Sequence, residues 1–439
     1  MLNLRIMKWI LRPDNISDAI DKVTKNKGAP GIDKMTCAEV EGYFAKHGKE
    51  IWEQVRTGTY KPTPVRRVYI PKPNGKKRPL GIPVVVDRVV QQAVAQVLSL
   101  GYERYFSNNS YGYRPGVGAQ HAVDVACTYL DQGYEWVVDL DIEKFFDTVN
   151  HDKLIAILRE RVNEDNVIKL IRAFLKAGVM EDGLYTRTEE GVPQGGPLSP
   201  ILSLVYLDKL DKELDKRGLH YCRYADDVCI FVGSKQAAER ILNSISLWIE
   251  KELHLKVNAT KSKVVRPSHS IFLGYTFWKS PKEGWSCRPA NDRKQRLKDK
   301  LKAATLRKRA VARNIGETIT KVNQILRGWI NYYALGNMAT FMKELGEWLR
   351  HKIRVIIIKQ WKRPRTIYRN LMQLNNRFHC NFTQKEIYMV ANTRLGLYKQ
   401  CGMHVINFLL SPEVLQTPNE KTNRPGLVDP YEYYQKVHW

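Results

Sequence analysis

The sequence has no apolar run that approaches the roughly 20 residues of a membrane-spanning helix. Its seven cysteines are an odd number and include no Cys-x-x-Cys pair, which argues against a disulfide framework and against a zinc site. The N-terminal stretch lacks the small-residue cleavage site of a signal peptide. We therefore expect a cytoplasmic protein with no membrane partner, whose cysteines are reduced and mostly buried.

Acidic residues are scarce relative to basic ones. Asp and Glu number 45 against 71 Lys and Arg, which gives a formal net charge of +26. Such an excess would repel itself without a polyanionic partner, and nucleic acid fits better than the alternative, an anionic membrane surface. With 439 residues, of which 43% are apolar, the chain can bury a sizeable core and should form two or three domains.

The stretch 221–232, YCRYADDVCIFV, places two adjacent carboxylates, Asp226 and Asp227, between two apolar β-prone runs. This pattern predicts a strand, a tight turn and a second strand, with the acids at the tip. An Asp-Asp pair in a turn is usually only solvated, but here aromatic and apolar residues surround it. Because like charges this close raise each other's pKa, the stretch favours a bound metal cation.

A second pair of acids lies within 136–142, WVVDLDI, which is short and rich in β-branched residues and is predicted to be a buried strand. Asp139 and Asp141 then lie on the same face, because side chains alternate along a strand. A carboxylate on a central strand is costly unless it is paired or binds a metal. At least one of these two acids is therefore a candidate metal ligand.

Further elements follow from local patterns. Residues 66–70 and 78–82 flank a Pro-Asn-Gly turn and predict a β-hairpin dense in Lys and Arg, which suits polyphosphate binding better than plain solvation. The loop KGAPGID is a connector for which phosphate contact is the less favoured alternative. We expect helices at 87–104, 120–130, 201–214 and 236–253, irregular structure at 191–200, and a strand at 271–278 whose glycine lets another backbone come close.

Beyond Pro281 the composition becomes basic and helical. Residues 293–313 lack Pro and Gly and carry ten Lys or Arg against one acid, Asp299. A phosphate backbone explains so lopsided a helix better than a solvated face does. Residues 315–336 and 340–361 predict two more helices, and Pro364 is expected to end this module. The pattern of 365–439 predicts no particular fold.

Together these stretches resemble the reverse transcriptases, and closely the compact maturase–reverse transcriptases of bacterial group II introns. The family's motifs occur in the family order over essentially the whole chain: NKGAPGID, RRVYIPKPNGKKRPLGIP, SYGYRPG, VVDLDIEKFFDTVNHDKL, GVPQGGPLSP, RYADD, LKVNATKSKV, FLGY and LRGWINYYALGNM.

The resemblance implies an α+β right-hand polymerase fold whose antiparallel palm sheet carries YADD. An N-terminal extension leading into the fingers is expected over 1–60, and fingers and palm over 61–288. An α-helical thumb, or maturase X domain, is expected over 289–364, and a small C-terminal DNA-binding region over 365–439. No homing-endonuclease tail is expected.

The resemblance also assigns roles by position. Asp141, Asp226 and Asp227 match the catalytic aspartates, and with Ile142 they are expected to hold two Mg²⁺ ions, for which Mn²⁺ can substitute. Phe145 or Phe146 is expected to be the aromatic gate that rejects ribonucleotides; a bulge would exchange their faces, so spacing does not choose between them. The other residues expected to bind the incoming deoxynucleoside triphosphate (dNTP) are Arg66, Lys72, Arg78, Gln194 and Lys261. Those expected to contact primer and template are Phe272, Leu273, Gly274, Arg296, Lys300 and Arg327.

The function so implied is that of an RNA-directed DNA polymerase that copies intron RNA into cDNA by target-primed reverse transcription, and of a maturase that assists splicing and mobility of its intron. Its expected partners are the group II intron RNA, an RNA template with a DNA or RNA primer, target DNA and dNTPs, in the bacterial cytoplasm near the nucleoid. One alternative is a domesticated relative that serves DNA repair or phage defence. Another is an RNA-binding maturase with a vestigial polymerase, against which the three intact aspartates count.

Overall fold

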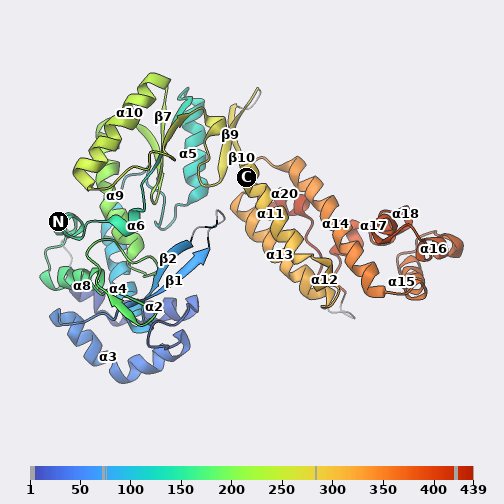
Figure 1. Ribbon diagram of the computed structural model, residues 1–439, viewed down its shortest axis with the longest axis horizontal. Helices are drawn as coiled ribbons and strands as arrows, with labels where there is room; N and C mark the ends of the chain where they lie inside the picture. Colours follow the sequence, from blue (N-terminus) through green and yellow to red (C-terminus); the bar gives the residue numbers. More distant parts are fainter. Residues whose placement is uncertain (1–4, 72–74, 76, 282–283, 420–423, 439) are drawn as a thin grey trace. The chain divides into compact units, whose positions relative to one another are not determined.

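The computed structural model describes residues 5–71, 75, 77–281, 284–419 and 424–438. The chain divides into two compact units, Met1–Leu273 and Gly274–Trp439. In Figure 1 the first unit runs from blue to yellow and the second from yellow to red.

The first unit is built around a 4-stranded antiparallel sheet in the order β6-β7-β3-β8. Its strands are β3 (Trp136–Asp141), β6 (His220–Tyr224), β7 (Asp227–Val232) and β8 (Lys263–Val265). β-Branched and aromatic residues fit such strands because they pack well on a pleated surface. The predicted strand–turn–strand around the adjacent acids is confirmed, and the strand predicted at 136–142 is confirmed to within one residue.

Three helices pack on this sheet: α5 (Ala119–Asp131) on β6, α9 (Ser199–Lys216) also on β6, and α10 (Lys235–Trp248) on β3 and β8 (Figure 1). α10 continues into one π-helical turn, Ile249–Leu253. The irregular stretch predicted at 191–200 is wrong at its end, because α9 begins at Ser199. Pro200 then lies in the first helical turn, where its missing N–H costs no hydrogen bond.

A second sheet of the first unit has the order β2-β1-β4-β5. Its strands are β1 (Val65–Pro71), β2 (Lys77–Ile82), β4 (Val179–Glu181) and β5 (Leu184–Thr186). β1 and β2 pair antiparallel, with Arg66 opposite Ile82 and Ile70 opposite Arg78, which confirms the predicted basic hairpin. Lys72 falls in the part of this hairpin that lies outside the described residues.

The remaining helices of the first unit surround these sheets. Helix α4, predicted at 87–104, is mostly buried, with Val89, Val94 and Leu98 fully inaccessible to solvent. In addition to α5, α9 and α10, the α-helices of the first unit are α1 (Ile6–Ile10), α2 (Pro13–Asn26), α3 (Val40–Thr57), α4 (Val85–Tyr102), α6 (Phe145–Thr148), α7 (His151–Arg159) and α8 (Asp165–Leu175). Single 3₁₀ turns lie at Cys37–Glu39, Glu103–Tyr105 and Pro267–His269.

The second unit begins with a hairpin of β9 (Tyr275–Ser280) and β10 (Gly284–Pro289). The strand predicted at 271–278 is therefore wrong in its first half. Leu273 and Gly274 have φ values of +52° and +83°, which no strand residue adopts. The prediction that another backbone comes close to Gly274 is also wrong, because the nearest atoms belong to side chains: a Cβ on Gly274 would lie 2.5 Å from the Tyr333 hydroxyl oxygen.

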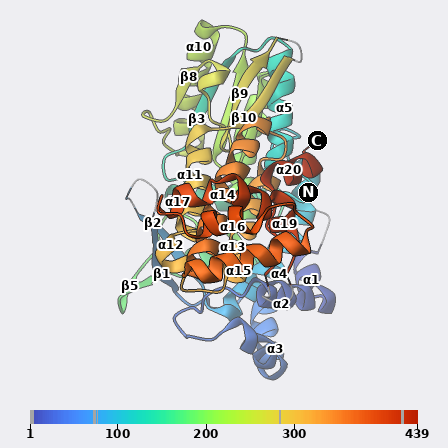
Figure 2. The same cartoon turned by 90° about the vertical axis from the view of Figure 1, so that its right-hand side faces the viewer.

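Helices make up the rest of the second unit (Figure 2). They are α11 (Asn291–Ala304), α12 (Arg307–Ala310), α13 (Ile315–Tyr332), α14 (Ala339–Trp361), α15 (Pro364–Arg377), α16 (Gln384–Ala391), α17 (Leu397–Cys401), α18 (His404–Leu409), α19 (Pro412–Gln416) and α20 (Pro430–Val437). No helix among the described residues is long and apolar enough to cross a membrane. The cysteines are unbridged and mostly buried, as expected.

Two predictions for this unit need correction. The single helix expected over 293–313 is divided into α11 and α12, because the Thr305 hydroxyl donates to the Leu301 carbonyl (2.7 Å) and the chain then leaves the helix at Leu306. Pro364 does not end the helical module. It occupies the first turn of α15, where proline is favoured, so the module continues into the C-terminal segment.

Candidate active site

The turn between β6 and β7 consists of two residues, Ala225 and Asp226, with Tyr224 paired to Asp227 across it. Ala225 has a φ of +56°, in the left-handed region that glycine usually occupies at the first position of such a turn. On its other edge β7 pairs with β3, and this register sets Asp227 opposite Asp141, the last residue of β3. Three carboxylates therefore meet at one end of the sheet.

These three acids repel one another. Burial by the surrounding protein, with the charges of Asp226 and Asp141, raises the pKa of Asp227 to about 6. Burial and the charge of Asp141 also raise the pKa of Asp226, while Arg78 and Lys261 oppose that rise. Carboxylates held together in this way are stabilised by a cation.

Lys261 supplies one such cation. Its ammonium nitrogen lies 2.8 Å from Asp141 Oδ1 and 3.0 Å from Oδ2. The loop that carries it is tied to the end of β3, because the Asn258 amide donates to the Asp141 carbonyl (2.8 Å) and the Asp141 amide donates to the Ser262 hydroxyl (3.0 Å). The backbone thus fixes where Lys261 enters the site, while its exposed side chain is free to change partner.

Asp139 lies on the same strand and the same face as Asp141 but in a different environment. Its Oδ1 accepts hydrogen bonds from the Ser270 hydroxyl (2.6 Å) and the Cys229 thiol (3.4 Å). Burial raises its pKa, against these hydrogen bonds and the nearby charge of Lys263. Its bonding is therefore satisfied by the protein, which distinguishes it from the acids at the end of the sheet.

The donor set fits a divalent metal of the hard, oxygen-binding kind. Within the described ranges, no group of three or more His, Cys, Asp or Glu side chains is arranged so that it could hold a metal ion. Mg²⁺ does not need such a group, because it is usually held by one or two carboxylates together with water and substrate phosphates. Asp141 and Asp227 line a groove of about 320 Å³ together with Thr260, Lys261 and Phe272, which leaves space for such a substrate.

Two of the predicted nucleotide-binding residues, Arg78 and Lys261, lie close to this end of the sheet. Arg78 of β2 is exposed, and its charge is near enough to Asp226 to oppose the rise in the pKa of that carboxyl. Gln194 lies beside the same strand, because its carbonyl accepts a hydrogen bond from the Gly81 amide (2.8 Å). Arg66 instead donates two hydrogen bonds to the Pro30 carbonyl (3.1 and 2.7 Å), so its guanidinium is already engaged within the protein.

The two candidate gate residues differ in burial. Phe145 is 2% exposed and packs edge to face against Tyr206 in the core. Phe146 is only half-buried at the margin of that core, and its carbonyl accepts a hydrogen bond from Val192 (2.6 Å) in the loop that leads to Gln194. Of the two, only Phe146 retains a surface that a substrate can touch.

The predicted primer and template contacts divide between the two units. Phe272 is buried and Leu273 half-buried in the first unit, and the second unit begins at Gly274. Arg296 and Lys300 are exposed on α11, whose Leu297 and Leu301 are buried. Arg327 is exposed on α13, with its guanidinium 6.0 Å from the Tyr433 ring centre.

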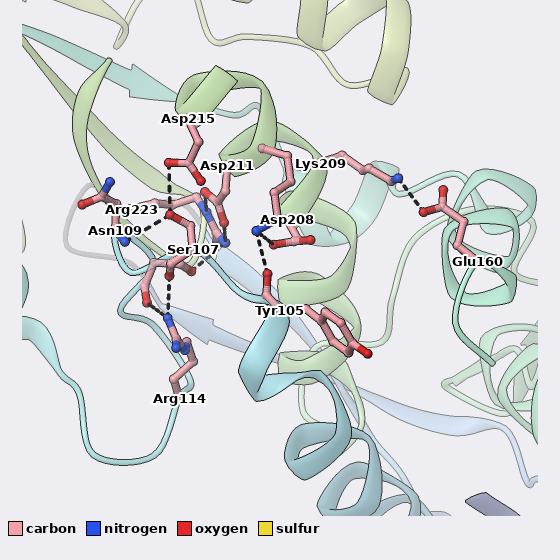
Figure 3. Close-up of polar contacts among 12 residues, drawn as sticks. Tyr105, Ser107, Asn109, Arg114, Glu160, Asp208, Lys209, Asp211, Asp215 and Arg223 are labelled. Carbon is pink, nitrogen blue, oxygen red and sulfur yellow. Dashed lines mark hydrogen bonds and ion pairs between the residues drawn. The ribbon is translucent and has the colours of Figure 1, made fainter. Parts of the chain in front are cut away.

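Arg223 was not among the residues predicted for the site. It is fully buried on β6, and its Nη1 donates to the Ala225 carbonyl in the turn between β6 and β7 (2.9 Å). Figure 3 shows its pairing with Asp211. The sequence signal that could have identified Arg223 was an arginine within a run that is otherwise typical of a buried strand. Residues 107–114, which overlap the SYGYRPG motif (110–116), were likewise not expected to lie along β6. Ser110 pairs with Arg223 in a parallel bridge there.

Comparison with known proteins identifies relatives of both units. The reverse transcriptase (RNA-dependent DNA polymerase) family matches residues 70–277, and the group II intron maturase-specific domain matches residues 294–374. Protein YkfC of Escherichia coli (strain K12) is 33% identical over 312 residues, covering 62% of this chain and 82% of YkfC. The group II intron-encoded protein LtrA of Lactococcus lactis subsp. cremoris is 32% identical over 339 residues, covering 62% of this chain and 56% of LtrA. A putative COX1/OXI3 intron 2 protein of Saccharomyces cerevisiae is 28% identical over 349 residues, and the chain covers 40% of it.

Proposed function

Because this chain belongs to the reverse transcriptases of the group II intron maturase family, we propose that it is an RNA-directed DNA polymerase that also assists splicing and mobility of a group II intron. The observation that carries the polymerase assignment is the register that sets Asp141 opposite Asp227, beside Asp226 at the tip of the hairpin. Acids gathered at the open end of a sheet, next to a groove, suit metal-assisted nucleotidyl transfer.

Asp141, Asp226 and Asp227 would hold two Mg²⁺ ions, or Mn²⁺ in their place, with the backbone of Ile142 as a further ligand. When bound, such ions lower the pKa of the attacking primer 3′-hydroxyl and offset charge on the leaving pyrophosphate. The protein's own contribution is to fix the carboxylates on rigid strands and to supply cations for the triphosphate. Arg78 and Lys261 lie close enough to the acids to serve as those cations.

The remaining nucleotide contacts are proposed on the same basis. Gln194 would contact the nucleotide from the loop beside β2, and Lys72 would contact it from the hairpin. Arg66 would hold the KGAPGID loop against the hairpin through Pro30, and would reach a phosphate only by exchanging that carbonyl for it. Phe146 would press on the sugar and reject a 2′-hydroxyl, since Phe145 is committed to the core.

Contacts with primer and template are proposed for each unit by itself. Phe272, Leu273 and Gly274 would support the primer end, and the exposed cations of α11 and α13 would bind the duplex backbone. This proposal keeps the expected functional regions: the N-terminal extension (1–60), fingers and palm (61–288), thumb (289–364) and C-terminal DNA-binding region (365–439). Their bounds differ from those of the fold, in which the first compact unit ends at Leu273 and the helices continue past Pro364. The proposal also keeps the bacterial cytoplasm as the site of action, and the intron RNA and target DNA as the partners.

A primer-extension assay tests the polymerase directly. The purified chain, given an RNA template, a DNA primer, dNTPs and Mg²⁺, should synthesise cDNA, and chelation of the metal should stop it. A splicing assay with a group II intron RNA tests the maturase separately. Synthesis without any effect on splicing would favour a domesticated polymerase, whereas splicing without synthesis would favour a maturase with a vestigial polymerase.

A further inference from the structure

Arg223 is a fully buried arginine three residues before Asp226. Its guanidinium contacts three separate parts of the first unit, as Figure 3 shows in part. Nε donates to Asp211 Oδ1 (2.6 Å) and Nη2 to Asp211 Oδ2, both on helix α9. Nη2 also donates to the Ser110 hydroxyl (2.7 Å), and Nη1 donates to the carbonyl of Ala225 (2.9 Å) in the catalytic turn.

The hydrogen bond to the Ala225 carbonyl is the contact that can affect the conformation of the turn carrying Asp226. Ala225 holds a left-handed φ of +56° without being glycine, so its conformation needs support from its surroundings. The guanidinium is planar, and Asp211 holds it by two parallel hydrogen bonds, which fixes its orientation. A fixed donor thus points at the carbonyl immediately before Asp226.

The segment 107–114 encloses the same turn from another direction. Its backbone pairs with that of Arg223, through the Arg223 amide to the Asn109 carbonyl (2.8 Å) and the Tyr111 amide to the Arg223 carbonyl (2.9 Å). Gly112 then lies so close that a Cβ on it would be 2.4 Å from the Ala225 nitrogen. Arg114 secures the segment by donating to the Ser107 (2.6 Å) and Ser110 (2.7 Å) carbonyls.

Stability alone does not explain this arrangement. Removing two charges from water costs about as much as their attraction returns, and apolar residues of similar volume often serve a fold equally well. What an apolar side chain could not do at position 223 is donate a hydrogen bond to Ala225. The geometry therefore points to a role in shaping the turn.

We propose that Arg223, oriented by Asp211 and Ser110, is a positioning residue that holds the Ala225–Asp226 turn in the conformation that presents Asp226 to the reacting centre. The proposal rests on the polymerase function proposed above. Because Arg223 is fully buried, it has no surface that a nucleotide or primer could reach. Its replacement should therefore act on turnover and on the metal requirement, and leave nucleotide binding largely intact.

The test uses the full-length chain with Arg223→Lys, which keeps the buried charge but cannot donate in three fixed directions. Its matched control is Arg217→Lys, the same change in an arginine that pairs with Glu213 on the surface of the same region. A second variant, Arg223→Met with Asp211→Leu, removes both charges together and so avoids leaving one unpaired. Each protein is measured by hydrogen–deuterium exchange, by thermal unfolding, and by primer extension over a range of dNTP and Mg²⁺ concentrations.

We expect backbone exchange to rise within 221–232 while α5, α9 and α10 keep their protection. In the same variants kcat should fall by about 10- to 100-fold, as ångström-scale misplacement of a catalytic group does. KM for dNTP should change by no more than about twofold, since the missing interaction belongs to the reacting state. The Mg²⁺ concentration for half-maximal synthesis should rise, and Arg217→Lys should match the wild type throughout.

Three results would overturn the proposal: unchanged exchange in 221–232, increased exchange throughout the first unit, or a loosened turn with wild-type kcat. If Arg223→Lys does not fold, the double variant decides by the same criteria. Hydrogen exchange does not depend on catalysis. If the wild type makes no cDNA, the proposed function fails, and the exchange data still decide whether Arg223 holds the turn.

Discussion

The ammonium nitrogen of Lys261 lies 2.8 Å and 3.0 Å from the two carboxylate oxygens of Asp141, from a loop 120 residues further along the chain. This pair sets a cation beside the acids that are proposed to bind metal. Since the Lys261 side chain is 65% exposed, it can leave Asp141 for a phosphate when substrate arrives. One side chain would then act as counter-ion in the free protein and as phosphate ligand in the complex.

Lys261→Gln should change two kinetic constants in opposite directions. With the competing cation removed, the Mg²⁺ concentration for half-maximal synthesis should fall. Without its bond to a phosphate, KM for dNTP should rise several-fold. Steady-state primer extension measures both, and Lys263→Gln is the control because its partner is Asp139. Parallel changes in the two constants would argue against an exchange of partners by Lys261.

Asp226→Asn should reduce DNA synthesis by at least about 10²- to 10³-fold, because the loss of one charged group at a metal centre removes several kcal/mol of transition-state stabilisation. Asp139→Asn is the matched control, since Asp139 already has protein partners for its carboxylate. That variant should retain synthesis and lose only stability. Extension at near wild-type rate by Asp226→Asn with Mg²⁺ would show that Asp226 is not a metal ligand.

Phe146→Val should admit ribonucleotides, because a smaller side chain no longer collides with the 2′-hydroxyl. Phe145→Val should instead lower the free energy of unfolding by roughly 1–3 kcal/mol through a cavity in the core, with sugar selection unchanged. Incorporation from mixtures of ribo- and deoxyribonucleotides measures selection, and chemical unfolding measures stability. If Phe145→Val alone relaxes selection, the two assignments must be exchanged.

The pair Arg296→Ala and Lys300→Ala should weaken binding of an RNA–DNA hybrid equally for all sequences. Both side chains project into solvent from α11, and bonds to phosphates carry no base information. For each phosphate that is no longer neutralised, the slope of log K against log salt should become shallower, by about 0.9 on a B-type duplex, and products made in one binding event should shorten. Lys46→Ala with Lys49→Ala on α3 is the control. A double variant on α11 with unchanged affinity, salt slope and product length would mean that α11 is merely solvated.

Asp87 should make stability depend on pH in a direction unusual for a carboxylate. Burial raises its pKa from 3.8 to about 6, although the Tyr60 hydroxyl (2.6 Å) and the Thr63 amide (2.9 Å) donate to it. The folded form therefore binds the proton more tightly than the unfolded form. This contribution to stability is complete below pH 3.8 and is lost as the pH rises through 6.

Asp87→Asn should remove this dependence. The free energy of unfolding of the wild type, relative to the variant, should decrease by ~2.4 kcal/mol between pH 4 and pH 7. Urea unfolding at the two pH values measures it, with Asp18→Asn as an exposed control. A difference that stays constant with pH would mean that Asp87 keeps an ordinary pKa in the folded protein.

Local patterns in the sequence were sufficient to predict the strands that carry the acids. The alternation within 136–142 and the apolar runs on both sides of Asp226 predict strands, because the alternation of side chains along a strand depends only on residues that are close in sequence. The basic hairpin and helix α4 were predicted for the same reason. The ordered motifs predicted the family to which the chain belongs, and the comparisons confirm that prediction.

Packing between distant segments decided what local pattern could not. Burial of Phe145 against Tyr206 distinguishes it from Phe146, although the two are adjacent in sequence. The turn at Leu273 interrupts a run that is apolar enough for a strand.

The pairing of Lys261 with Asp141 and the hydrogen bond from Arg223 to Ser110 join segments that are more than a hundred residues apart in the sequence. The sequence by itself therefore determined which residues form the acidic end of the sheet. The tertiary structure determined which of their charges are compensated, and by what, because long-range electrostatic and hydrogen-bonding partners are set only when the chain has folded.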